Sequence, residues 1–586
     1  MKKVKGSKGI TLVALVITVI VLLILAGVSI ATLTGDNGLL AKAQEAKEAT
    51  EESAKREQAE LNQLLMDMEG ELGEQYDTEG QVNKPLLLTG MTAIKFNNPT
   101  TDAKGSINTD VSEGWYNYEA KEWANAQTED GSLWVWIPRY AYKITYYTDA
   151  TKENESADKT QYGSIDVKFL VGTTDQYYDE ATGKLETAVR AKTANDEIDA
   201  TKNYVVHPAF TDESSSELNY ANGGWDKELT GIWVSKFEAG YASGNNSAPV
   251  KASSVKYTQA TVWANEKETG TEDGDMPARN WLDGVYGKQE GNSYTWLNGE
   301  VSIKYPTFQG KTYAMNYINI NDAFNITKVL NESGNIYGLS TDSDSHLMKN
   351  SEWGAVAYLG QSQYGLNGTN VYVNNANLNN STESVYAVTG MCSAESADKT
   401  VVITTIENIN SIEGNTAQDN LYTWDQINGQ KASSTGTIYG VYDMSGGTGE
   451  RTAGYVANGA ENLKNYGRSL AYDEEILRTT SIKYTTVYPH SSEDKNGPSQ
   501  TINELSQENY EENTKIYGDG IRETSIQGTG NKSWYNYYSI FTAWYNPFTV
   551  RGGGYNSGSG AGWFAFTRTH GNSHYSGGFR AVLCAQ

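Results

Sequence analysis

GIWVSKFEAG, residues 231–240, is the stretch from which the fold of this 586-residue chain can be worked out. Apolar Ile232, Val234 and Phe237 alternate with polar residues, which predicts a β-strand. The earlier run GSLWVWIPRY, residues 131–140, is apolar, aromatic and β-branched, and predicts a second, buried strand. Large side chains can each bury ~150–250 Å², so four tryptophans are expected to centre the core. They are Trp134, Trp136, Trp233 and Trp353.

Three further motifs follow in the chain. HLMKNSEWGAVAY occupies 346–358, YGVYDMSGG occupies 439–447, and RGG at 551–553 is followed by GFRAVL at 578–583. Together with 231–240, in this order, the set resembles formylglycine-generating-enzyme-like domains, and the resemblance implies a helix around Glu352 and Trp353. The resemblance implies the sulfatase-modifying-factor branch of the C-type lectin fold, with few regular strands and long structured loops. The expected class is therefore α+β.

The N-terminus carries a different signal. MKKVKGSKG, residues 1–9, is basic, and ITLVALVITVIVLLILAGVSIATL, residues 10–33, has no charged residue. A helix of this length crosses the ~30 Å hydrocarbon layer of a membrane, with the basic end in the cytoplasm. The pattern resembles the prepilin leader of type IV pilins, which implies that a prepilin peptidase cuts between Gly9 and Ile10. Ala14 stands where that family usually has Glu, which favours a minor or tip subunit. An ordinary single-pass anchor is the alternative, and the length of the run argues against a cleaved signal.

The remaining organisation is read from composition. Residues 34–70 are rich in strong helix formers and predict a stem helix, or alternatively a solvated spacer. Residues 71–85 read as a linker, and 86–586 as the head. Within the head, a polar insertion at the surface is expected at about 148–222, and one helix at 314–329.

The net charge limits the classes of partner, and the number of cysteines limits the disulfides that the fold can contain. The net charge is −26, and removing the four lysines of the leader gives −30 (−26 − 4). This acidic balance disfavours nucleic acid and anionic membrane surfaces as partners of the head. Only Cys392 and Cys584 are present, so no disulfide framework holds the fold. Two unpaired buried thiols are expected, with a single bridge as the alternative.

No catalytic motif stands out. The resemblance to formylglycine-generating enzymes would require a copper-binding cysteine pair, and neither Cys392 nor Cys584 occupies those positions. His570 and His574 are four residues apart, a metal-pair spacing on a helix, but they lie in a glycine-rich stretch where no helix is expected. We therefore predict a non-enzymatic head without a catalytic metal or cofactor. A structural calcium site is a candidate at 374–383, which is rich in Asn and Glu oxygens, although no fixed spacing singles out a set of ligands.

The segment 533–576 consists mainly of Tyr, Trp, Asn, Ser, Gly and His, a composition that resembles that of antibody paratopes. It also resembles the C-terminal variable regions of lectin-fold proteins that are diversified by retroelements. The residues that fit such a set are predicted to bind ligand. They are Tyr535, Asn536, Tyr537, Tyr545, Tyr555, Asn556, Thr569, His570, Asn572, Ser573, His574 and Tyr575. The alternative is an ordinary end of the fold with Trp544, Phe548, Trp563, Phe564 and Phe566 as core.

These features predict a pilin-like adhesin or receptor-binding protein, held at the cell membrane or in a surface pilus with its head outside. Its expected partners are the membrane, prepilin peptidase, pilus subunits, and an extracellular protein, glycan or phage ligand. A divergent oxidase of the formylglycine-generating type and a structural minor pilin without a dedicated ligand are the two alternatives.

Overall fold

The structure is a computed structural model, and it describes residues 82–585 apart from several gaps. The gaps are 191–197, 213–223, 242–253, most of 258–300, 316–317, 375–386, 394–420, 474, 491–506, 508–509, 512–513, 515, 543–544, 556, 573 and 575. The predicted leader, the apolar run 10–33, the stem helix 34–70 and most of the linker lie outside the described residues. Within the residues that are described, no helix is both long enough and apolar enough to cross a membrane.

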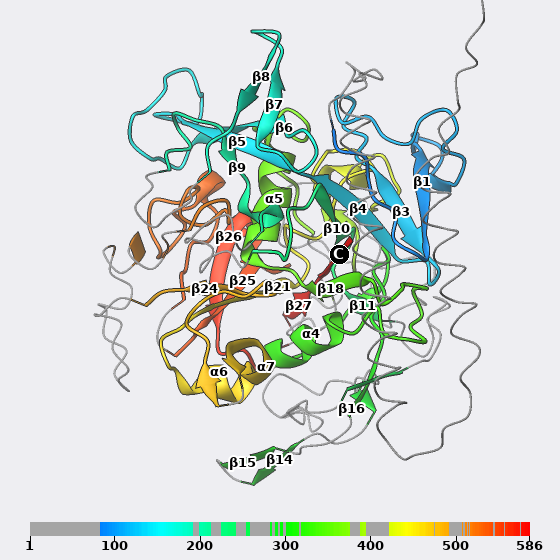
Figure 1. The fold of residues 1–586 in the computed structure, drawn as a ribbon, viewed down its shortest axis with the longest axis vertical. Helices are drawn as coiled ribbons and strands as arrows, with labels where there is room; N and C mark the ends of the chain where they lie inside the picture. The colour runs from blue at the N-terminus through cyan, green and yellow to red at the C-terminus, as the bar shows by residue number, and fades with distance from the viewer. Residues whose placement is uncertain are drawn as a thin grey trace, which may run out of the picture. The chain divides into compact units, whose positions relative to one another are not determined.

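The largest sheet has seven strands, all paired antiparallel, in the order β18-β28-β10-β4-β3-β1-β2 (Figure 1). Their bounds are Ser343–Leu347 (β18), Ala581–Ala585 (β28), Gly231–Ser235 (β10), Leu133–Pro138 (β4), Asn125–Thr128 (β3), Met91–Asn97 (β1) and Ser106–Asn108 (β2). Both predicted strands are confirmed, and Trp233 of β10 lies opposite Trp136 of β4. Every residue of β10 is buried, so this strand has core on both faces.

A five-stranded sheet carries the C-terminal part of the chain. Its order is β24-β21-β25-β26, and β27 pairs with β21. The bounds are Thr486–Tyr488 (β24), Gly449–Val456 (β21), Phe548–Gly552 (β25), Gly562–Thr569 (β26) and Gly577–Phe579 (β27). β24 and β27 run parallel to β21, whereas β25 is antiparallel to both β21 and β26.

Helix α5, Asn350–Gln361, is buried along its whole length, and it packs on β4, β6 and β21. It confirms the helix predicted around Glu352 and Trp353. The Glu352 carboxylate accepts the backbone N–H of Lys349 at 2.8 Å and so caps the helix start. The fully buried indole of Trp353 donates to the carbonyl of Trp563 at 2.7 Å, which ties the helix to β26.

Helix α4 is shorter than predicted. It covers Ile320–Thr327 rather than 314–329, because Tyr313–Ala314 form strand β17 and Asn319 caps the helix by accepting the N–H of Asp322. The other helices are α6, Glu461–Tyr466, and α7, Arg468–Ala471.

The remaining strands form small sheets. They are β5 (Tyr140–Tyr146), β6 (Gly163–Phe169) and β9 (Val205–Val206); β7 (Gln176–Asp179) and β8 (Lys184–Thr187); β11 (Gly240–Tyr241) and β17; β12 (Ser254–Tyr257), β16 (Val301–Lys304) and β13 (Leu282–Asp283); β14 (Gly287–Glu290) and β15 (Ser293–Trp296); β19 (Met391–Ser393) and β20 (Leu421–Thr423); and β22 (Tyr472–Asp473) and β23 (Ile476–Leu477).

Part of the predicted surface insertion 148–222 belongs to the core. Strand β6 pairs with all of β5, and Val167, Phe169 and Phe210 are buried in the main hydrophobic cluster. The expectation of a polar insertion at the surface is therefore wrong for this part, because its apolar residues are spread thinly among polar ones and give no long apolar run.

The expected fold class is also wrong. The structure is mostly sheet, with 32% strand against 13% helix and only four α-helices among the described residues. The described part is therefore not the loop-rich α+β C-type lectin domain that was expected, and the predicted pilin-type helix lies outside the described residues. The resemblance implied few regular strands, whereas many short segments form strands here because they pair with partners far away in the chain.

The four tryptophans that were predicted to centre the core do lie in it. Trp134, Trp136, Trp233 and Trp353 are all fully buried. Cys392 and Cys584 are both buried thiols outside any disulfide, as predicted, and they belong to two different hydrophobic clusters.

Candidate functional site

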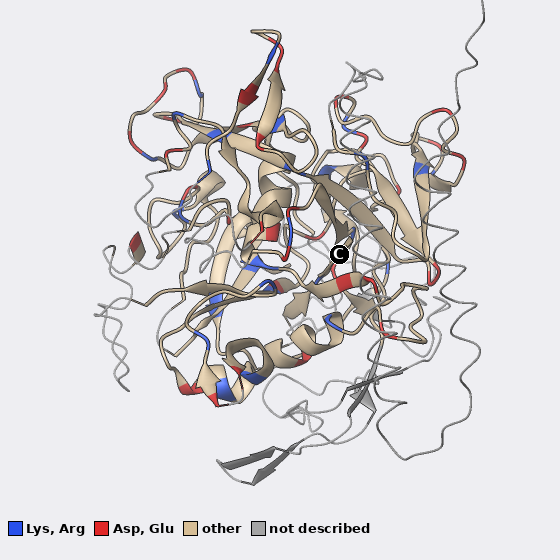
Figure 2. Ribbon diagram, viewed as in Figure 1, with Lys and Arg blue, Asp and Glu red and all other residues tan. Residues whose placement is uncertain are grey.

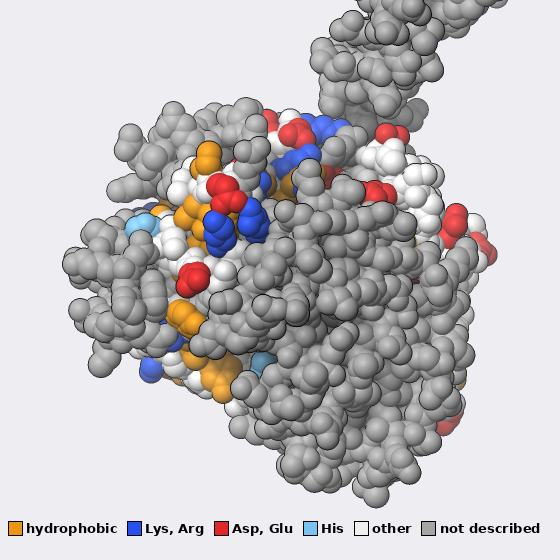
Figure 3. Space-filling view, turned by 90° about the horizontal axis from the view of Figure 1, so that it is seen from below, with side chains coloured by type: hydrophobic (Ala, Val, Ile, Leu, Met, Phe, Trp, Pro, Cys, Tyr) orange, Lys and Arg blue, Asp and Glu red, His pale blue; other side chains and the backbone are white. Residues whose placement is uncertain are grey.

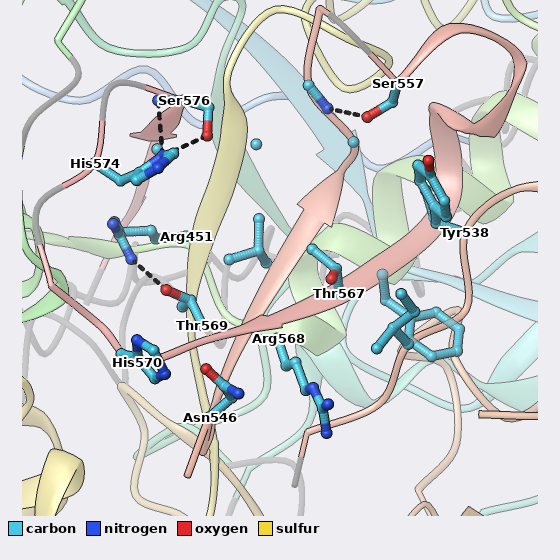
Figure 4. Close-up of a pocket in the computed structure, with 18 of the residues that line it drawn as sticks. Arg451, Tyr538, Asn546, Ser557, Thr567, Arg568, Thr569, His570, His574 and Ser576 are labelled. Carbon is cyan, nitrogen blue, oxygen red and sulfur yellow. Dashed lines mark hydrogen bonds between the residues drawn. The ribbon is translucent and has the colours of Figure 1, made fainter. Parts of the chain in front are cut away.

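A cavity of about 530 Å³ opens over the five-stranded sheet (Figure 4). The strand register places Arg451 of β21 opposite Val550 of β25, and Val550 opposite Thr567 of β26. Directly paired residues point to the same face of a sheet, so these three side chains form a row across the floor. The described residues that form the walls are Tyr538, Ile540, Asn546, Gly553, Gly554, Ser557, His570, Asn572, His574, Ser576 and Gly577. The site is thus built on paired strands and closed by loops.

Arg451 is the side chain at the base of this site. It is 2% exposed, and its Nε donates to the carbonyl of Ile318 at 3.1 Å. Its Nη2 donates to the carbonyl of Asn572 at 2.5 Å. Its Nη1 donates to Oγ1 of Thr569 at 3.5 Å, the bond drawn in Figure 4. All three acceptors are neutral. Burial lowers the pKa of Arg451 to about 10, which still leaves the guanidinium charged at neutral pH.

The polar groups around the cavity come from several loops. His574 Nδ1 lies 2.7 Å from Oγ of Ser576, and Ser557 Oγ accepts the N–H of Gly554 at 3.0 Å. Figure 4 shows Arg451 and His574 at one end of the site and Tyr538 at the other. The cavity therefore offers a charged end and an aromatic end.

The described residues that line the cavity include no Asp or Glu, although they include Arg451, Arg568, His570 and His574. The whole segment 524–586 contains no Asp or Glu, in a chain that has 72 of them. Figure 2 shows the result in β25 and β26, which carry basic and no acidic positions. Elsewhere the signs are mixed: on the described part of the face in Figure 3, basic and acidic side chains lie next to each other.

Four of the predicted ligand-binding residues meet at this cavity: Thr569, His570, Asn572 and His574. Tyr545 lies beside them, 43% exposed, with its ring centroid 4.6 Å from that of His570. Asn536 is exposed and Tyr535 is half-buried, but neither lines the cavity. Asn556, Ser573 and Tyr575 fall outside the described residues.

Tyr537 and Tyr555 do not lie where a contact surface requires them. They are 2% and 3% exposed. The ring of Tyr537 covers Gly562 so closely that a Cβ there would lie 2.1 Å from the ring, and its hydroxyl bonds to Oδ1 of Asn370. The rings of these two tyrosines, which were predicted to bind ligand, fill the interior and present almost no surface. Of the proposed core alternatives, Phe548, Trp563, Phe564 and Phe566 are buried.

Sequence reasoning missed Arg451, Thr567 and Tyr538 as parts of the site. Arg451 precedes the C-terminal segment by more than 80 positions, and only strand pairing brings it there. The absence of acidic residues after Glu523 was the available signal for a positively biased site.

The candidate calcium site is only partly described. Asn374 is buried, and its side-chain amide donates to the carbonyl of Val388 and to Oδ1 of Asp443, both at 2.9 Å. Residues 375–383 lie outside the described part of the chain. In the part that is described, no cluster of three or more His, Cys, Asp and Glu side chains is arranged to hold a metal ion.

A scan against protein-family models gives no match for this chain, and a search of curated proteins finds none either.

Proposed function

We propose that this chain is a recognition protein that holds its ligand in the cavity above β21, β25 and β26 and performs no chemistry on it. The observation that carries the proposal is the convergence of Thr569, His570, Asn572 and His574 on one cavity floored by paired strands. Its volume of about 530 Å³ falls within the ~300–1,000 Å³ of small-molecule sites. A small ligand, or the terminal unit of a larger one, fits this space.

The contact between His574 and Ser576 supports binding rather than catalysis. A serine nucleophile needs a histidine whose ring nitrogen is free to take its proton, and a third group that orients the ring. Here Nδ1 of His574 also accepts the backbone N–H of Ser576 at 3.3 Å, which occupies the lone pair that a base would use. The described lining residues include no carboxylate that could orient the ring.

The raised pKa values of the two cysteines also argue against a thiol-dependent oxidase. Burial raises the pKa of Cys392 to about 12 and the pKa of Cys584 well above its usual value. Both are therefore held as neutral thiols, whereas the thiolate is the form that reacts or binds a metal.

The proposed location is the cell surface, and it rests on the N-terminal sequence. The basic residues 1–9 and the uncharged run 10–33 support export of the head, with cleavage between Gly9 and Ile10 by prepilin peptidase. N-terminal sequencing of the protein isolated from cells tests this part, since Ile10 should be the first residue. A protein that retains Met1 would contradict it.

The binding proposal is tested by filling the cavity. Thr567 is half-buried on the floor, so Thr567→Phe places a ring in the ligand space without entering the core. The matched control is Thr182→Phe, in the exposed turn between β7 and β8. The full-length wild type and both variants are applied to an array of glycans and peptides.

We expect at least one ligand that the wild type and Thr182→Phe retain and Thr567→Phe loses, while all three proteins unfold at the same temperature. An array on which no binding depends on Thr567 would contradict the proposal.

A further inference from the structure

We infer that the cavity receives an anionic group of the ligand, a carboxylate, sulfate or phosphate, and that Arg451 supplies the charge that attracts it. This inference rests on the proposed ligand site and specifies the chemical class of what binds there.

The first argument is the missing counter-ion of Arg451. Within the described part of the chain, four arginines are buried: Arg139, Arg451, Arg551 and Arg580. Three of them have an acidic group nearby. Arg139 pairs with Asp175 and Glu228, Arg580 pairs with Glu450, and Asp519 stabilises the charge of Arg551.

Among the described residues, Arg451 has no such partner, because its hydrogen bonds go to two carbonyls and one hydroxyl. A buried cation without a counter-ion is unfavourable, since charges inside a protein are ordinarily paired. A ligand that brings a negative charge to the cavity compensates Arg451. A neutral ligand leaves it as it is.

The second argument is the geometry of the guanidinium. An arginine has five N–H donors in a planar fork that matches the oxygens of carboxylates and phosphates. The described residues accept three of these N–H groups, one from each nitrogen. No described residue accepts the second N–H of Nη1 or of Nη2, and Arg451 is among the residues that line the cavity, so we expect these two groups to meet the ligand.

The third argument is the charge of the surroundings. The protein carries a net charge of −26, so an anion is repelled from most of its surface. The described lining of the cavity has no acidic residue, and the segment 524–586, which supplies most of it, has none either. An anion that enters here meets Arg451 in a low-dielectric site, where the attraction is strongest.

The experiment measures the NMR signal of the Arg451 side chain directly. Full-length protein labelled with ¹⁵N-arginine gives few Nε–H signals, and these are recorded while sodium acetate, sodium sulfate or sodium phosphate replaces sodium chloride at constant ionic strength. We expect a saturable shift of one signal, that of Arg451, with at least one of the three anions. The anion that shifts it most distinguishes a carboxylate from a sulfate or phosphate ligand.

Three variants identify the cause. Arg451→Gln should lack the responding signal, and Thr567→Phe should keep this signal but lose its response, because the ring blocks the approach. Lys532→Gln removes one positive charge from the same segment outside the cavity, so its apparent Kd should stay within about twofold of the wild-type value. If Arg451→Gln does not fold, Thr567→Phe alone decides the question.

No shift with any anion, or equal small shifts of all arginine signals, would overturn the inference. So would a response that survives in Thr567→Phe. The inference fails separately from the proposed function if the array identifies a neutral ligand that depends on Thr567 while none of the three anions shifts the Arg451 signal.

Discussion

Gly577 and Arg451 are in such close contact that a Cβ atom on Gly577 would lie 2.8 Å from Nη2 of Arg451. The guanidinium is fixed on its other edges by the carbonyls of Ile318 and Asn572, so it cannot simply swing aside. The backbone of β27 therefore sets the position of the charge at the base of the cavity.

Gly577→Ala should displace this guanidinium. We expect the free energy of unfolding to fall by about 1–3 kcal/mol, as for other insertions of one carbon into a packed site. The response of Arg451 to anions should weaken at the same time. Denaturant unfolding and the arginine titration measure the two effects. Ser559→Ala, at an exposed position of a nearby loop, is the control and should change neither. An unchanged anion response in Gly577→Ala would show that the position of Arg451 does not matter.

The C-terminal tyrosines should separate into two groups. Tyr537→Ala removes a buried ring and should lower the free energy of unfolding by about 3–5 kcal/mol. Tyr545→Ala removes a ring that is 43% exposed and in contact with His570, so it should lower this free energy by no more than about 1.5 kcal/mol. Denaturant unfolding compares them. Similar losses for both would place Tyr545 in the core.

Glu523 should make stability depend on pH. It is half-buried, and it accepts hydrogen bonds from the hydroxyls of Tyr142 and Tyr358 at 2.9 and 2.8 Å and from the N–H of Gly518. Burial raises the pKa of Glu523 to about 7 from 4.5. The folded state thus holds this proton more tightly than the unfolded chain does. The contribution of Glu523 to stability is full below about pH 4.5 and is lost as the pH rises through about 7.

Glu523→Gln mimics the protonated carboxyl group and should remove this dependence. Between pH 4.5 and 8, wild type should lose on the order of 3 kcal/mol more free energy of unfolding than the variant does. Denaturant unfolding at a series of pH values measures the difference. Parallel curves for the two proteins would show that Glu523 titrates normally.

Removing Arg580 from its buried pair with Glu450 should lower stability more than removing the charge of Glu450. Arg580 donates from Nε to Glu450 at 2.6 Å, and its charge also lowers the pKa values of Glu238 and Asp443, which burial raises. Arg580→Met leaves three buried carboxyl groups without this cation and should lower the free energy of unfolding by about 3–5 kcal/mol. Glu450→Gln leaves two carboxyl groups facing the same cation and should destabilise the protein less.

Lys464→Met breaks an exposed pair with Glu475 and serves as the control, with an expected loss of about 0–1 kcal/mol. Equal losses for Arg580→Met and Glu450→Gln, measured by denaturant unfolding, would contradict a shared role of Arg580.

Strands and helices with a strong local pattern could be predicted from the sequence. The dense aromatic runs at 131–140 and 231–240 became β4 and β10, and the residues around Trp353 became α5. The fold class could not be predicted, because strands such as β21 and β27 have few apolar residues and exist through pairing with distant segments.

The candidate site was predicted in part. A composition of Tyr, Asn, Ser and His located the loop from Thr569 to His574, but it cannot tell a tyrosine that faces solvent from one that faces the core, such as Tyr537. Arg451 was missed because its role follows from its burial without an acidic partner among the described residues, which only the folded structure shows. A single arginine in GERTAGYV gives no sign that its carboxylate partner is missing.

Strand β28, the last five residues before Gln586, lies between β18 and β10 within the seven-stranded sheet. Its partners precede it by more than 200 residues, so both are synthesised well before the strand that joins them, and this sheet closes late. Until then β10 and β18 keep unpaired backbone edges, which are prone to join other chains. Deleting β28 would leave this gap permanently open and expose both edges to other chains, so the solubility of the head depends on this one short strand.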